Sequence, residues 1–248
     1  MKKWFLLTCM ALLALPRPAG AIAFVRSASA SSSTSSTTVA ASFPTNAAGD
    51  LLVVVAEWND NGATATIADT ALNSYSVALG PVDNPDSQFR QQIWFVANSA
   101  ASAGTNTVTV TFSVAQAAKS ILIHEYSGLN TSSPLDRSAS ASGTGTALGS
   151  GLTAATAQAD ELIFGIGTND TATVTHTAGT GFTLRETQGP SAGQRVSSED
   201  KIVAATGQYN ATFTASATGT WTALVVTFKG AGGAAPAPKR LPVLGVGR

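Results

Sequence analysis

The order of apolar and polar residues along the chain predicts β-strands. Within residues 107–114, Val108, Val110 and Phe112 alternate with threonines. A period of two indicates a strand with one side against a core. Residues 51–56 are apolar without interruption, as in a strand that is covered on both faces or that crosses the middle of a sandwich. Turn-forming residues such as Asn59 to Gly62 separate these segments.

The chain contains an internal duplication. Residues 26–30 recur unchanged as 137–141, which lie 111 positions later. Residues 123–128 resemble 225–230 at a spacing of 102. A spacing that shrinks along the chain is expected when the second copy has shorter loops. Each copy holds about seven short predicted strands, which favours an antiparallel β-sandwich.

The predicted fold is therefore all-β, with two related antiparallel β-sandwich units of immunoglobulin-like or jelly-roll type. A single larger sandwich, formed by merging the two copies, is the alternative. The first unit is placed at 22–128 and the second at 129–230. A Gly/Ala/Pro-rich tail follows at 231–248.

The N-terminus has the pattern of a signal peptide spanning residues 1–21. Lys2 and Lys3 precede an apolar run and then small residues, which predicts a mature chain starting at Ile22 or Phe24. The protein is expected to be secreted or periplasmic, without stable membrane insertion after cleavage. The only cysteine, Cys9, lies in this segment, so the mature chain would have no thiol and no disulfide. A disulfide-free exported protein suggests a bacterial source.

Composition and charge argue against several functions. Only 11% of the residues are charged, and 14 basic side chains balance 14 acidic ones, so nucleic acid is not an expected partner. Two histidines and no mature cysteine do not build a usual zinc site, and no metal or cofactor is predicted. No Gly-x-Ser-x-Gly motif and no strand of alternating acids occurs, so an enzyme is not predicted.

The two histidines are interpreted as structural. His124 and Glu125 are neighbours on a predicted strand, so their side chains point to opposite faces and cannot form a dyad. We expect a packed His124 with Glu125 at the rim, and a partly buried His176 with satisfied hydrogen bonds.

Aromatic residues supply the candidate binding site. Sugars stack on exposed tryptophan rings flanked by polar groups. The predicted contact surface consists of Trp58, Trp94, Asn59, Asp60 and Gln92. Trp94 aligns with Lys201 of the other copy, and Trp221 aligns with Lys119, which suggests positions near solvent. The alternative is that these tryptophans cap the edges of the core. The segment from Asp60 to Gly62 also has two interpretations, a calcium loop or a structural turn.

Several strings carry a resemblance to a known group of proteins. They are the sequence IHEYSG at 123–128, SPLD at 133–136, ADEL at 159–162, GFTLR at 181–185 and EDK at 199–201. Together they resemble duplicated β-sandwich modules of exported bacterial and metagenomic proteins. The resemblance implies the fold and export, and it supplies no site residues.

The function expected from the sequence is that of an exported, non-catalytic binding or adhesion module for a polysaccharide or cell-surface glycan. The sequence also leaves open whether copies of the protein associate with one another. The alternatives are a structural surface, matrix or fibre subunit and, second, a glycan-active hydrolase.

Overall fold

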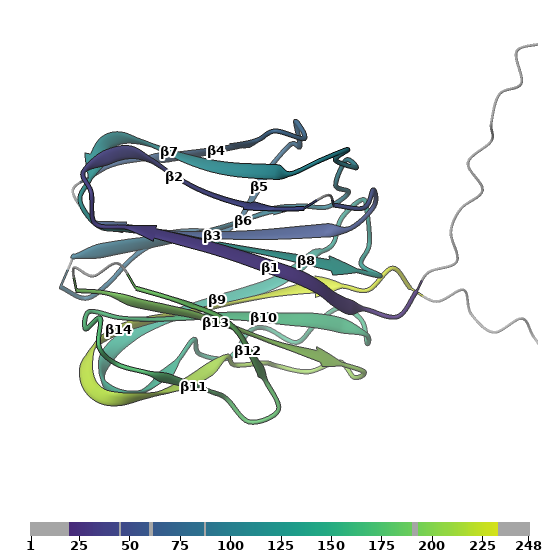
Figure 1. Ribbon diagram of the computed structural model, residues 1–248. Coiled ribbons are helices and arrows are strands. Elements are labelled where there is room, and N and C mark those ends of the chain that lie inside the picture. The colour runs from purple at the N-terminus through teal and green to yellow at the C-terminus, as the bar shows by residue number, and fades with distance from the viewer. Residues whose placement is uncertain (1–19, 45, 60–61, 87, 190–192, 233–248) are drawn as a thin grey trace, which may run out of the picture.

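A computed structural model describes residues 20–44, 46–59, 62–86, 88–189 and 193–232, and these residues form strands and loops without any helix (Figure 1). The all-β prediction is confirmed. Most of the predicted signal peptide, with Cys9, lies outside the described residues. The same holds for Asp60 and for the tail from residue 233 onward.

The first unit is a sandwich of two antiparallel sheets. A five-stranded sheet has the order β1-β8-β3-β6-β5, and a three-stranded sheet has the order β2-β7-β4. The strands are β1 (Ala23–Ser32), β2 (Ser36–Phe43), β3 (Leu51–Asn59), β4 (Ala65–Asp69), β5 (Ser76–Asp83), β6 (Phe89–Val96), β7 (Asn106–Gln116) and β8 (Lys119–Ser127).

The second unit repeats this topology. Its strands are β9 (Leu135–Gly149), β10 (Glu161–Asn169), β11 (His176–Ala178), β12 (Thr183–Gln188), β13 (Arg195–Val203) and β14 (Thr212–Lys229). The order β9-β14-β10-β13-β12 corresponds to the five-stranded sheet of the first unit. The early part of β14 pairs with β11 and with the end of β9, as β7 pairs with β4 and β2. Two long strands, β9 and β14, therefore replace four strands of the first unit.

The two units stack through their five-stranded sheets, so that the molecule has four layers (Figure 1). Strand β1 lies against β12, and β5 lies against β9 and β14. These packing contacts between the units are reciprocal, because β12 is the counterpart of β5 and β9 is the counterpart of β1. The stack is thus the intramolecular equivalent of a two-fold symmetric dimer interface.

The continuous apolar run of β3 follows from this stacking. Leu52 and Val54 face the core inside the first unit, whereas Val53 and Val55 face the layer between the units. Both faces of the strand are buried, so no polar alternation is needed. The prediction of a strand covered on both sides is confirmed.

Contacts on one side of the stack show which residue of β10 lies opposite Val53 of β3 across the layer between the units. Val53 pairs with His124 on β8. The His124 ring hydrogen-bonds the Ser198 hydroxyl across the layer at 2.8 Å. Ser198 in turn pairs with Ile166 on β10. On this side Val53 is level with Ile166.

Contacts on the other side give a different height. Val53 also pairs with Phe95 on β6. The Phe95 ring packs on Phe228 with centroids 5.6 Å apart, and Phe228 pairs with Leu162. Here Val53 is level with Leu162. Since twisted sheets cross at an angle, the residue opposite Val53 in the middle of the stack is the one between Ile166 and Leu162, which is Phe164.

Polar groups also join the two units. The Tyr126 hydroxyl donates to Asp200 at 2.7 Å, and Arg185 forms an ion pair with the same carboxylate. The Arg185 guanidinium lies 3.9 Å from the centre of the Phe24 ring, which is a cation–π contact. At the edge, Ser27 and Ser29 donate to the two oxygens of Glu186.

Candidate functional site

The two tryptophans of the predicted platform are buried. The Trp58 side chain has no exposed area, and its ring packs on Phe112 at a centroid distance of 5.5 Å. Its indole N–H donates to the carbonyl of Ala63. Trp94 is 3% exposed and belongs to the same core. The prediction of exposed ring faces is wrong, because both rings are buried within the core of the first unit.

The strand register explains the error for Trp94. Trp94 pairs with Val54, and the equivalent pair in the second unit is Gly165 with Glu199. The structural counterpart of Trp94 is therefore Glu199, two residues before Lys201. A side-chain period of two keeps the same face, so the shift was invisible in the sequence pattern.

The alignment of Trp221 with Lys119 is correct, but the inference that this position lies near solvent is wrong. Trp221 does correspond to Lys119, since these residues pair with equivalent positions on β10 and β3. Lys119 is itself buried, and its ammonium group donates to the carbonyls of Thr34 and Gln116. A lysine in the sister unit therefore does not indicate solvent.

The polar residues of the predicted platform do not form a surface either. Gln92 is 7% exposed. The Asn59 side-chain oxygen accepts the backbone N–H of Ala118, which ties two chain segments together. Asp60, including its interpretation as a calcium ligand, lies outside the described residues. The four described residues of the predicted platform, Trp58, Trp94, Asn59 and Gln92, thus offer no shared contact face.

A different surface carries the regular polar groups. The solvent side of the sheet β2-β7-β4 forms what we call the outer hydroxyl face, and it consists of Thr38, Ala40, Ser42, Thr66, Ala68, Thr107, Thr109 and Thr111. Thr38, Thr111 and Thr66 form one row across the three strands. Rows repeat about every 6.8 Å along a strand, and neighbouring strands lie about 4.8 Å apart.

The outer hydroxyl face is uncharged. The only charged residue in β2, β4 and β7 is Asp69, which is 8% exposed and accepts hydrogen bonds from Asn73, Tyr75 and Asn106. The sequence already held this signal, because the threonines are the polar half of the alternation that predicts β7. The predicted contact surface was placed on tryptophans, the usual platform for sugars, and therefore did not include these threonines.

The second unit has a smaller version of this face. Thr214 pairs with Ala147 on β9 and with Thr177 on β11. Thr214 and Thr177 are exposed, and Thr212 is half-buried. The strands that carry the two hydroxyl faces, β2, β7 and β4 in the first unit and β11 with the early part of β14 in the second, form opposite outer layers of the stack (Figure 1).

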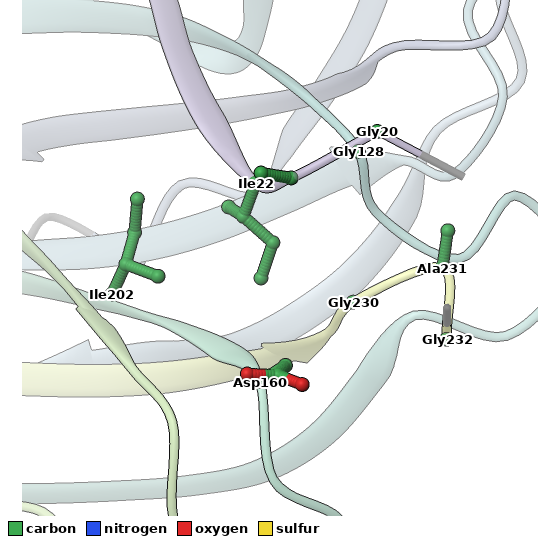
Figure 2. A pocket seen from close by; sticks show the side chains of 9 residues that line it. Gly20, Ile22, Gly128, Asp160, Ile202, Gly230, Ala231 and Gly232 are labelled. Carbon is green, nitrogen blue, oxygen red and sulfur yellow. The ribbon is translucent and has the colours of Figure 1, made fainter. Parts of the chain in front are cut away.

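One pocket lies where the described chain begins and ends (Figure 2). It is lined by Gly20, Ala21, Ile22, Gly128, Asp160, Ile202, Gly230, Ala231 and Gly232. Asp160 is the only titratable residue among them. Either predicted cleavage, before Ile22 or before Phe24, would remove at least Gly20 and Ala21 and open the pocket. We therefore assign it no role.

The histidines are held inside the molecule. His124 has no exposed area and bonds Ser198, while His176 is 7% exposed and bonds both Ser197 and Asn169. The expected packing of both rings is confirmed. Glu125 is not at the rim as predicted: it is fully buried, and Arg26 approaches its carboxylate to 2.6 Å.

Buried acids form a pair in each unit. Burial raises the pKa of Glu125, and the neighbouring Asp50 raises it further. Burial likewise raises the pKa of Glu161 to about 7, with a contribution from Asp136. Both glutamates have no exposed area, so these pairs do not face a cleft. Among the described residues, no group of three or more His, Cys, Asp or Glu side chains could hold a metal ion.

The buried His124 makes a pH-dependent contribution to stability. Burial lowers its pKa to about 3 from the ordinary 6.5. The unfolded chain therefore binds a proton that the folded chain rejects, so this contribution is complete above pH 6.5 and is lost as the pH falls. In a His124→Gln variant, which keeps a partner for Ser198, we expect this loss to disappear. Between pH 6.5 and about 4.5 the wild type should lose about 2–3 kcal/mol relative to the variant, measured by urea unfolding. A constant difference over this range would contradict the assignment.

No helix in the described part of the chain has the length and apolarity needed to cross a membrane. The chain matches no protein-family model, no curated protein and no solved structure.

Proposed function

We propose that this protein is an exported, non-catalytic binding module that attaches to neutral polysaccharide through its outer hydroxyl faces. The observation that carries the proposal is the uncharged lattice of Thr and Ser side chains on β2, β4 and β7, repeated in smaller form on the second unit. The candidate ligand is the one predicted from the sequence, and the contact surface is moved from the tryptophans to this lattice.

The chemistry of the face favours an extended neutral polymer. Hydroxyl groups both donate and accept hydrogen bonds, so a regular array of them complements the hydroxyls of a sugar chain. Charged ligands would find no counter-charge on these strands. Each contact would be weak, and many parallel contacts would add through avidity. Two faces on opposite layers would also allow one molecule to bridge two chains.

A double substitution on β7 tests the proposal. In a Thr109→Lys, Thr111→Lys variant, two solvated ammonium groups stand in the middle of the lattice, and we expect retention on insoluble cellulose, chitin or β-glucan to fall roughly tenfold. The measurement is a depletion isotherm with the mature chain.

The matched control places the same two charges elsewhere. Thr183 and Thr187 are exposed on β12, away from the outer layers. A Thr183→Lys, Thr187→Lys variant should bind as the wild type does. The proposal fails if the wild type is retained on none of these polymers, or if both double variants lose retention equally.

A structural role is the second candidate, and strand β9 favours it. This strand has 15 residues and pairs only with β14, so its other edge has no strand partner among the described residues. Long free edges can add further strands from other chains. Sedimentation that shifts to larger species as the concentration rises would support this role.

A further inference from the structure

A cluster of buried polar side chains lies between the two units, apart from the outer faces. Glu57 on β3 pairs with Gln91 on β6 and with Ser120 on β8. All three have no exposed area. Directly paired residues have Cβ atoms about 5 Å apart, so the three side chains are neighbours in one row.

The row faces the layer between the units. Glu57 follows Val55 by two residues, and Gln91 and Ser120 stand two residues before Ile93 and Leu122. Val55, Ile93 and Leu122 all belong to the apolar cluster of that layer. Because side chains alternate along strands, the polar row continues this same face.

Thr168 completes the cluster from the second unit. It follows Ile166 on β10 by two residues, has no exposed area and faces the same layer. Since Val53 lies opposite Phe164 in the middle of the stack, four further residues along both strands bring Glu57 opposite Thr168. Because β3 and β10 run in the same direction, residues that follow Val53 and Phe164 by equal numbers of positions also lie opposite each other.

None of these groups has a hydrogen-bond partner within the described part of the chain. The unpartnered atoms include both carboxylate oxygens of Glu57, the amide group of Gln91 and the hydroxyls of Ser120 and Thr168. Burial alone raises the pKa of Glu57 to about 8, and no cationic side chain opposes this shift. A buried carboxyl below this pKa avoids the cost of a buried charge by taking up a proton, whereas above it the isolated carboxylate is very costly unless a cation compensates its charge. A turn of the Gln91 amide could donate one hydrogen bond but could not supply the missing positive charge.

We propose that the cluster of Glu57, Gln91, Ser120 and Thr168 binds one monovalent alkali cation, Na⁺ or K⁺, between the two units. The cluster offers five oxygen atoms, counting the Gln91 side-chain carbonyl, and hard cations prefer oxygen ligands. One carboxylate balances one positive charge. A divalent ion would leave a net charge in a dry layer. The ion would join ligands from both units and so stabilise their stacking.

Thermal unfolding of the mature chain tests the site. At a pH of about 9 the Glu57 carboxyl is ionised in the folded state. Relative to tetramethylammonium chloride at equal ionic strength, saturating NaCl or KCl should raise the midpoint by roughly 5–10 °C, and the comparison of the two salts identifies the ion. Equal midpoints in all three salts would overturn the proposal.

Two variants and one control assign the effect to this cluster. The ion response should vanish in Glu57→Gln and weaken in Thr168→Val, which removes only an unpartnered hydroxyl and serves if the first variant does not fold. In Glu199→Gln the response should persist, because the Glu199 oxygens already accept N–H groups from Gly179 and Thr212. A response that survives in Glu57→Gln refutes the site.

Crystals soaked in a thallium(I) salt give a readout that does not depend on stability. Thallium(I) resembles K⁺ in charge and size and scatters anomalously. An anomalous peak between Glu57 and Thr168 is expected. Its absence at saturating thallium overturns the proposal.

Discussion

Replacing Trp58 with alanine should lower the free energy of unfolding by about 3–5 kcal/mol. The ring is fully buried between the two sheets of the first unit, packs on Phe112 and donates its N–H to Ala63. Its removal leaves a cavity that neighbouring side chains cannot fill, and it also removes the hydrogen bond from the indole to the carbonyl of Ala63. Urea unfolding followed by circular dichroism measures the change.

Trp221 provides the matched control. This ring is half-buried on β14 at the edge of a smaller apolar cluster. Because part of its surface is already in water, Trp221→Ala should cost clearly less than Trp58→Ala. Equal losses for the two variants, or a loss below about 1 kcal/mol for Trp58→Ala, would mean that Trp58 is not packed as described.

The first unit produced alone should not remain a soluble monomer. A chain of residues 22–128 exposes the face that carries Leu51, Val53, Val55 and Leu122, which the second unit covers in the whole molecule. Each such side chain contributes about 1.5–3 kcal/mol when buried. Together they rival the whole stability of a typical domain, about 5–15 kcal/mol. We expect aggregation, or a dimer that uses the same face twice.

Co-expression with the second unit is the control. A separate chain of residues 129–232 should restore a soluble one-to-one complex, since the contact needs no covalent link. Size-exclusion chromatography with light scattering gives the masses. A monomeric, cooperatively folded first unit would show that the stacked layer contributes little to stability.

The fold was predictable because strands with one or two buried faces have distinct patterns. The alternation in β7 and the continuous apolar run of β3 led to the all-β fold and to sheets covered on both sides. The shared topology followed from the duplication. The way in which the two copies stack was not predictable, since apolar positions show which sheet faces are buried but not which other sheet each of them packs against.

The candidate site was predicted at the wrong place for a related reason. The alternation of side chains along a strand defines two faces, and a tryptophan on either face can be buried in the core or exposed for sugar stacking. The alignment of Trp94 was two residues off, and Lys119 is buried in spite of its charge. The unpartnered state of Glu57 was also hidden, because it depends on which groups the second unit brings to the same layer.

The first and last described residues, Gly20 and Gly232, lie close together, so the two units could be joined in the opposite order without changing the described fold. Gly20 and Gly232 line one pocket, and the link between the units passes beside them at Gly128 (Figure 2). A circular permutant that lacks residues 1–19 and 233–248 could therefore join Gly232 to Gly20 with a short linker and open the chain between Gly128 and Pro134. Every strand pairing would be kept while the second unit is synthesised first.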